Sequence, residues 1–88
     1  MRIVWDEPKR LANLAKHGMD FASLTEDFFS EALIRDAKAG RLQAIGVDRN
    51  GVISVVFAIL GAEGISVISM RSASKLERKA YDDFTKGR

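Results

Sequence analysis

The stretch RLQAIGVDRNGVISVVFAIL, residues 41–60, is typical of two β-strands joined by a tight turn. The Asn-Gly pair at Asn50 and Gly51, between two apolar runs, is the strongest short-range signal for a β-hairpin. The second run is apolar at nearly every position, as in a central strand. A further turn, GAEG, leads into ISVISMR, residues 65–71, so the sequence predicts a meander of three strands.

A strand and a helix are predicted before this meander. RIVW, residues 2–5, has the β-branched and aromatic composition of a short strand. The next segment, residues 6–18, begins with Asp6, a good N-cap, and ends at Gly18, which suits a left-handed C-cap. The residues expected to form the apolar stripe of this helix are Leu11, Leu14 and Ala15.

Two further helices are predicted. Residues 20–33 repeat phenylalanine and leucine at helical spacing, with Asp20 as the N-cap. Either Ser72 or Ser74 can cap the helix predicted over residues 72–84, and Glu77, three residues after Ser74, completes a capping-box signature. The sheet-facing side chains of this last helix are expected to be Leu76, Ala80 and Phe84, with Arg78 and Asp82 as an outward ion pair. Residues 33–41 give a weak signal that fits a short strand or a loop.

This order of elements predicts one α+β domain over residues 1–88. We expect an antiparallel sheet of about four strands, with two N-terminal helices and one C-terminal helix on one face. No apolar run approaches the roughly 20 residues that cross a bilayer, and the N-terminus lacks the apolar stretch of a signal peptide. A cytoplasmic protein is therefore expected. The lack of cysteine and the single histidine argue against disulfides and a zinc site, so no cofactor is expected.

The charges are unevenly spread along the chain, although the net charge is only +2. Residues 1–18 carry a net +2 and residues 71–88 a net +3, whereas residues 19–40 carry a net −3. If the two ends meet in space, they form a modest basic patch for phosphates. A solvated surface of mixed charge is the alternative.

The polar residues suit cleavage of RNA without a metal. The RNA 2′-hydroxyl is the nucleophile, and the protein has only to move protons and stabilise charge on the phosphate oxygens. Lys9, Asn13, Lys16 and His17 share one face of the first predicted helix, and Arg71 ends a strand. Histidine suits proton transfer near neutral pH, and the arginine fork suits phosphate. Alternatively, His17 only bonds the end of its own helix and Arg71 is an exposed strand-end charge.

Three segments resemble the BrnT family of toxins. WDEPKRLANLAKHGMDF, residues 5–21, is similar to its opening signature: Trp-Asp, a proline, a lysine, an asparagine, then Lys-His-Gly and a phenylalanine. VISMRSASKLERKAY, residues 67–81, resembles its closing signature: Ile-Ser, an arginine, Ala-Ser, Glu-Arg and a tyrosine. Residues 41–57 fit the middle, with an arginine, an Ile-Gly pair, a tight hairpin and an apolar strand.

The resemblance implies a RelE-like fold and a ribonuclease toxin of a type II toxin–antitoxin system. The implied partner is a BrnA-type antitoxin, a small DNA-binding protein that neutralises the toxin and represses the shared operon, so operator DNA is reached only through the antitoxin. The implied catalytic residues are His17, Lys16, Arg41 and Arg71, and the expected substrate-binding residues are Lys9, Asn13 and Arg78. Glu77 and Tyr81 match the closing signature, and act either in catalysis or in holding the last helix to the sheet.

One position departs from the family pattern. Many members carry an arginine two residues before the Ile-Ser pair, where this chain has Ser66. A serine cannot supply a bidentate positive charge. An alternative function is therefore a catalytically weakened BrnT-like protein that acts mainly as an antitoxin-binding partner in operon autoregulation. A DNA-binding domain in its own right is disfavoured by the weak total charge.

Overall fold

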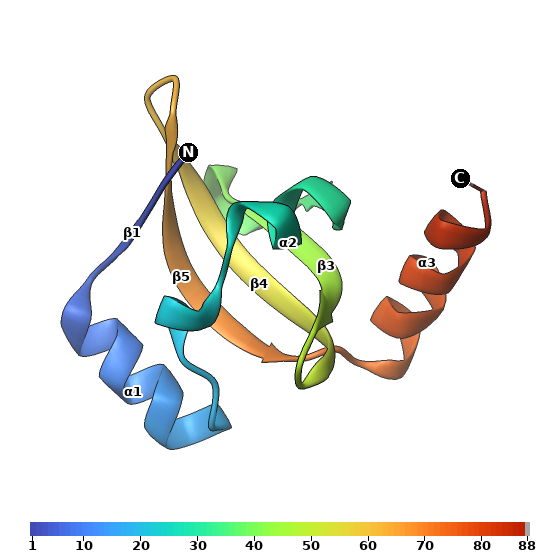
Figure 1. The fold of residues 1–88 in the computed structure, drawn as a ribbon, viewed down its shortest axis with the longest axis horizontal. Coiled ribbons are helices and arrows are strands. Elements are labelled where there is room, and N and C mark those ends of the chain that lie inside the picture. The colour runs from blue at the N-terminus through green and yellow to red at the C-terminus, as the bar shows by residue number, and fades with distance from the viewer. Residues whose placement is uncertain (88) are drawn as a thin grey trace.

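The computed structural model describes residues 1–87 and has the predicted α+β architecture (Figure 1). Its strands are β1 (Arg2–Trp5), β2 (Leu33–Asp36), β3 (Leu42–Asp48), β4 (Gly51–Leu60) and β5 (Gly64–Ser72). Its α-helices are α1 (Glu7–His17), α2 (Glu26–Glu31) and α3 (Lys75–Lys86), and two short 3-10 helices are η1 (Phe21–Ser23) and η2 (Lys38–Gly40). No helix among residues 1–87 is both long and apolar enough to span a membrane.

The sheet has five strands in the order β1-β5-β4-β3-β2. All neighbours are antiparallel except β1 and β5, which are parallel. The predicted sheet of about four antiparallel strands is therefore corrected to a mixed sheet of five. The prediction missed a strand because β2 is short and exposed, and it missed the parallel pairing because β1 and β5 lie at opposite ends of the chain.

The hairpin at the centre of the sheet is confirmed. Asp48 pairs with Gly51, and the backbone N–H of Asn50 donates to Asp48 Oδ1 at 2.7 Å. Gly51 has a φ of 97°, a conformation that a side chain would strain. The turn chemistry of Asn-Gly thus sets the register of β3 against β4.

The predicted helix over residues 20–33 is wrong in extent, because two caps divide it. Asp20 Oδ1 accepts a hydrogen bond from the N–H of Ala22 at 2.9 Å and begins η1. Thr25 Oγ1 accepts from the N–H of Phe28 at 3.2 Å and begins α2. The backbone between them is extended, so the chain turns a corner and then enters β2 at Leu33.

The main core lies between one face of the sheet and the segments η1 and α2. Phe21 and Phe28 are buried against residues of the central strands, among them Ile53, Val55 and Met70. Gly46 of β3 permits this packing, because a Cβ there would lie 2.9 Å from Phe28 Cε1. A side chain at this position would push α2 away from the sheet.

The helices occupy two faces of the sheet, not one. Side chains alternate along β3, so Gly46 faces α2 while Gln43 faces the other way and donates to Glu77 of α3 at 2.8 Å. Leu76 was expected to face the sheet but is 80% exposed, and half-buried Tyr81 lies on the inner side of α3 instead. Within residues 1–87 the i, i+4 ion pair of α3 joins Lys79 and Asp83 at 3.4 Å, so the expected pair of Arg78 and Asp82 is corrected.

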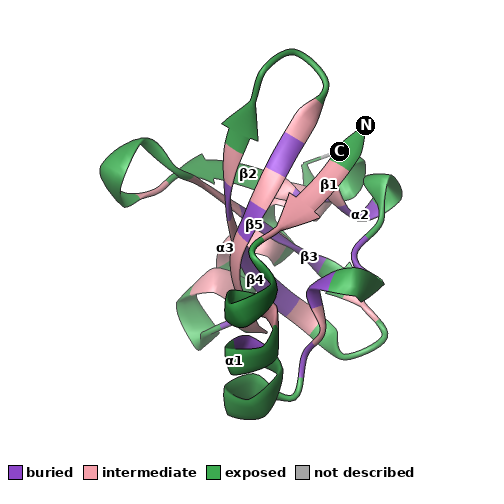
Figure 2. Cartoon of the chain, turned by 90° about the vertical axis from the view of Figure 1, so that its left-hand side faces the viewer, coloured by how far each residue is buried: buried purple, intermediate pink, exposed green. Residues whose placement is uncertain are grey.

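Helix α1 begins and ends as predicted, but the face expected to be buried is exposed to solvent. Asp6 accepts from the N–H of Lys9, and Gly18 is left-handed with a φ of 69°. The expected apolar stripe of Leu11, Leu14 and Ala15 is exposed, whereas Asn13 is buried. Figure 2 shows α1 coloured as exposed along nearly all of its length. The reason is that α1 lies against a polar strand edge and not against an apolar sheet face.

Candidate functional site

Asn13 fastens α1 to the open edge of β5. The pairing of β1 with β5 ends at Trp5 and Val67, while β5 continues to Ser72 with its edge unpaired on that side. Asn13 Oδ1 accepts from the N–H of Met70 at 3.0 Å, and Asn13 Nδ2 donates to the Met70 carbonyl at 2.9 Å. Nδ2 also donates to the carbonyl of Met19 at 3.2 Å. The side-chain amide of Asn13 thus takes the place that a continuation of β1 would occupy beside β5. It pairs with the N–H and carbonyl of Met70, which would otherwise be buried without a partner.

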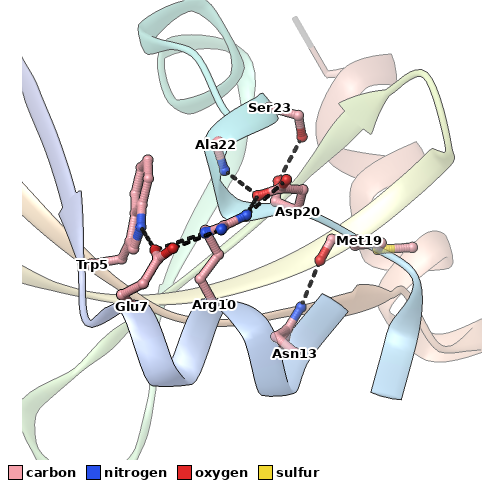
Figure 3. Close-up of polar contacts among 8 residues, drawn as sticks. All are labelled: Trp5, Glu7, Arg10, Asn13, Met19, Asp20, Ala22 and Ser23. Carbon is pink, nitrogen blue, oxygen red and sulfur yellow. Dashed lines mark hydrogen bonds and ion pairs between the residues drawn. The ribbon is translucent and has the colours of Figure 1, made fainter. Parts of the chain in front are cut away.

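A charged network fixes the same helix to η1 (Figure 3). Arg10 donates to Glu7 Oε2 at 2.7 Å and to both carboxylate oxygens of Asp20 at 3.1 Å. Trp5 Nε1 donates to Glu7 Oε1 at 3.0 Å. The Arg10 hydrogen bonds and then the Trp5 hydrogen bond lower the pKa of Glu7 to about 2. The bond from the Ala22 N–H and then Arg10 lower the pKa of Asp20. Arg10 therefore has a structural role, because it links α1 to Asp20 at the start of η1.

A shallow hollow of about 310 Å³ lies between α1 and β5. The residues that line it are Lys9, Ala12, Asn13, Lys16, His17, Ile68 and Ser69. Lys9 and Lys16 are seven residues apart, which places them on the same side of the helix. Both lysines and His17 are exposed, and no carboxylate within residues 1–87 pairs with them. The hollow is therefore a basic concavity with free donors, and it unites four of the predicted site residues.

A β-bulge shapes the strand that forms the floor of this hollow. Val56 of β4 pairs with Ser69 and Phe57 pairs with Val67, so Ile68 is the extra residue. Bulges bend a strand and re-aim its side chains. Here the bulge lies at the two β5 residues that line the hollow.

Arg71 belongs to a second cluster, at the end of β5. Its Nη1 and Nη2 donate to the two carboxylate oxygens of Glu77 at 2.8 and 2.9 Å, and Nη1 also donates to the Ser72 carbonyl at 3.1 Å. Arg71 and then the Ser74 N–H lower the pKa of Glu77 to about 2 against the cost of burial, and Glu77 raises the pKa of Arg71. The Glu77 side chain is 12% exposed and that of Arg71 is 43% exposed. Glu77 is thus a well-covered anion that holds a more open guanidinium.

One edge of the Arg71 guanidinium has no partner within residues 1–87. Arginine has five N–H donors, and the bonds to Glu77 and Ser72 use three of them. The remaining two are Nε–H and the second Nη2–H, which lie side by side on one edge. Two parallel donors on one edge match the geometry of a phosphate.

Three polar residues of this cluster were missed by sequence reasoning. Gln43 Nε2 donates to Ser54 Oγ and to Glu77 Oε2, both at 2.8 Å, and Gln43 Oε1 accepts from Arg35 Nη2 at 3.1 Å. Ser54 is 1% exposed. A lone serine within the apolar run of residues 52–60 is the signal that could have revealed a buried polar contact there.

The remaining predicted residues lie outside both clusters. Arg41 is exposed in extended backbone just before β3, two residues from Gln43, so alternation places it on the same face of the sheet. Arg78 is exposed on α3, and the ring of Tyr81 lies 6.3 Å from that of Phe84. Within residues 1–87, no hydrogen bond or ion pair joins these three side chains to the hollow or to Glu77. No group of three or more metal-ligating side chains is found in the same range.

Comparisons with known proteins identify a family and a solved structure that are similar to this chain. Residues 5–77 match the family model described as the ribonuclease toxin BrnT of type II toxin–antitoxin systems. A solved structure, the Brucella abortus ribonuclease toxin BrnT at 1.1 Å resolution, is similar to this chain with 54% sequence identity and a TM-score of 0.79. The similarity covers 85% of this chain and 99% of the Brucella chain. No curated protein sequence matches the chain.

The matched range includes α1, the hollow and the Arg71–Glu77 pair, and both the family model and the solved structure are those of a ribonuclease toxin. The chain therefore belongs to the BrnT family of ribonuclease toxins of type II toxin–antitoxin systems.

Proposed function

We propose that this toxin is an endoribonuclease that cleaves RNA without a metal, by attack of a 2′-hydroxyl on the adjacent phosphate. The observation that carries the proposal is the hollow beside β5, where His17, Lys9 and Lys16 meet with no carboxylate partner among residues 1–87. Three free cationic or proton-transferring groups on one small surface suit a phosphodiester. His17 is the single histidine of the chain and its best proton-transfer group near neutral pH.

The reaction has two proton transfers. A base takes the proton from the 2′-hydroxyl as its oxygen bonds to phosphorus, and an acid gives a proton to the 5′-oxygen as the P–O5′ bond breaks. The products are a 2′,3′-cyclic phosphate and a 5′-hydroxyl. We assign one of these transfers to His17. Lys16 lies next to it and stabilises negative charge on the phosphate oxygens, and Lys9 binds the neighbouring phosphate.

Arg71 is assigned to the phosphate through its free edge, and Glu77 to positioning that edge. A carboxyl group whose pKa lies at about 2 is ionised at neutral pH, so Glu77 has no proton to donate and is a weak base. Its contacts with Arg71, Gln43 and Ser74 fix the guanidinium instead. A fixed donor pair needs no reorganisation when charge develops in the transition state.

The other predicted residues take supporting roles in this proposal. Arg41 and Arg78 are exposed cations, and we assign them to RNA phosphates away from the cleaved bond. Asn13 supports the hollow by holding α1, since its amide is already bonded to Met70 and Met19. Tyr81 packs with Phe84 on α3 and is assigned to holding that helix.

Membership of a type II toxin family implies a cognate antitoxin. We propose that this partner is a BrnA-type protein that neutralises the toxin, and that operator DNA is bound only through it. The proposal includes a cytoplasmic activity in which cleavage of RNA inhibits translation.

The test is cleavage of end-labelled RNA by the purified chain in EDTA. We expect fragments with 2′,3′-cyclic phosphate ends and no cleavage of DNA of the same sequence, because DNA lacks the nucleophile. His17→Ala is expected to slow cleavage by roughly 10²-fold or more, whereas Lys79→Ala, on the exposed side of α3, is the matched control. Loss of cleavage in EDTA, or equal rates for wild type and His17→Ala, would reject the assignment.

A second function is favoured by one observation, the serine at position 66. Ser66 lies on β5 between Val4 of β1 and Ala58 of β4, at the position where the family resemblance implies an arginine. Loss of one charge-stabilising group costs about 2.7–4 kcal/mol of transition-state stabilisation. The second candidate is therefore a weakly active chain that serves mainly as an antitoxin-binding partner. It predicts little growth arrest on expression, and a rise in cleavage for Ser66→Arg. Strong growth arrest by the wild type would exclude it.

A further inference from the structure

Helix α1 presents its apolar side to solvent. Leu11 is 52% exposed and Leu14 is 37% exposed, and Ala15 is exposed beside them. The side toward the protein instead carries Asn13 and Arg10, which bond to Met70 and Asp20. A helix that packs only on its own domain turns its apolar stripe inward. The reversed arrangement of α1 leaves much of this stripe uncovered by residues 1–87.

The position of the stripe relates it to the proposed active site. Ala12 lines the hollow and also lies on the exposed part of α1, between the stripe and the two lysines. Lys9 and Lys16 flank the stripe on the side of the hollow and have no carboxylate partner within residues 1–87. The opposite flank is different, because Glu7 is already neutralised by Arg10. A ligand of the stripe therefore meets unpaired positive charge on one side only.

We propose that the antitoxin binds this toxin through the outer face of α1, with an apolar segment on Leu11, Leu14 and Ala15 and with acidic side chains against Lys9 and Lys16. The charge of the flank argues for an acidic partner over a second copy of this chain, which would bring a second pair of unpaired lysines to the same contact. The inference rests on the proposed function in one respect: a partner on α1 covers Lys9, Lys16 and His17, and so blocks the RNA site.

The proposal explains why Leu11 and Leu14 are exposed to solvent on the outer face of α1. Exposed apolar patches next to charged groups mark interaction surfaces, and a few buried anchors dominate the affinity of an interface. The exposed leucine of α3, Leu76, offers a contrast. It is 80% exposed but stands between the exposed residues Lys75 and Arg78, away from the hollow.

The experiment is titration calorimetry of the purified toxin with the purified antitoxin that is encoded beside it. The variant Leu11→Gln/Leu14→Gln is compared with wild type and with the control Leu76→Gln. We expect the double variant to bind the antitoxin at least about 100-fold more weakly, with an unchanged unfolding midpoint and unchanged RNA cleavage. Lys9→Glu is expected to weaken binding by roughly tenfold and to reduce its dependence on salt.

Binding and cleavage are measured separately, so the two proposals fail separately. If the wild type does not cleave RNA but the Leu11→Gln/Leu14→Gln variant still binds the antitoxin more weakly than wild type, the interface is supported and the ribonuclease assignment is rejected. Equal binding by wild type and the double variant overturns the interface. A wild type that sediments as a dimer and a double variant that sediments as a monomer, with antitoxin binding unchanged, also overturns it, because the stripe is then a contact between two copies.

Discussion

The two clusters along β5 differ in how their positive charges are held. Beside α1, Lys9, Lys16 and His17 are exposed and have no carboxylate partner within residues 1–87. At the end of β5, Arg71 is paired with Glu77 through two hydrogen bonds and is linked through Gln43 to the sheet. The first cluster is open to solvent, and the second is fixed.

The difference separates two tasks that a phosphate site requires. Moving a proton needs a group that is free to change its charge and its contacts. Stabilising charge needs a donor that is already in position. In this toxin a buried amide, Asn13, positions the whole helix that carries the open cluster. In the fixed cluster the carboxylate of Glu77 positions Arg71, and its negative charge partly offsets the positive charge of the guanidinium.

The largest effect is expected for His17→Ala. Removing the proton-transfer group should lower kcat for RNA cleavage by about 10²–10⁴-fold, or roughly 3–5 kcal/mol, with a much smaller change in KM. The thermal unfolding midpoint should stay the same, because the side chain is exposed. If the variant instead unfolds at lower temperature, the open cluster has a structural role and the contrast with Arg71 fails.

The reverse pattern is expected for Asn13→Leu. This change leaves the N–H and carbonyl of Met70 without partners, which should lower the free energy of unfolding by about 2–4 kcal/mol. Urea unfolding monitored by tryptophan fluorescence measures it. Leu11→Gln on the outer side of the same helix is the control and should cost under about 0.5 kcal/mol. A full loss of stability in the control and none in Asn13→Leu would show that α1 is held by its leucines.

Exchange of lysine and arginine should distinguish the two clusters more finely. Arg71→Lys removes the paired donors that bind Glu77 and leave an edge for phosphate, so we expect cleavage to fall about tenfold. Lys16→Arg keeps a positive charge at an open position and should stay within about threefold of wild type. Steady-state cleavage assays compare them. Equal losses in both variants would mean that the guanidinium of Arg71 is not specially positioned.

The smallest effect is expected for Glu77→Gln and depends on pH. The pKa of Glu77 is about 2 in the folded protein, below the ordinary 4.5. The stability that this ionised group contributes is therefore present above about pH 4.5 and is lost as the pH falls toward 2. At pH 7 we expect wild type to be more stable than the variant by about 1 kcal/mol, with the gap narrowing as the pH falls from about 4.5 toward 2. Urea titrations at several pH values test this, and a gap that does not change with pH would contradict it.

Much of the fold could be predicted because its signals are local. The caps at Asp6, Gly18 and Ser74 and the turn at Asn50 and Gly51 each depend on neighbouring residues, and all four are confirmed. The helix over residues 20–33 was wrong because Asp20 and Thr25 are both good caps, and sequence spacing does not decide how many are used.

The errors at α1 have a long-range cause. Spacing alone places Leu11 and Leu14 on an apolar face and Asn13 on a polar face, but it does not tell which face meets the protein. That depends on where β1 ends relative to β5, and on a hydrogen bond between residues 57 positions apart. The site residues that were missed, Gln43 and Ser54, likewise face the network only because α3 crosses the second face of the sheet.

The parallel pairing of β1 with β5 has a consequence for synthesis on the ribosome. Arg2 pairs with Gly64, and the helix that carries His17 is fastened to Met70, so neither contact forms until β5 has been translated. Contacts between distant residues also make folding slow compared with the formation of local turns. His17 is thus synthesised well before β5, the strand to which its helix is fastened. The hollow beside α1 is therefore complete only after β5 has been synthesised.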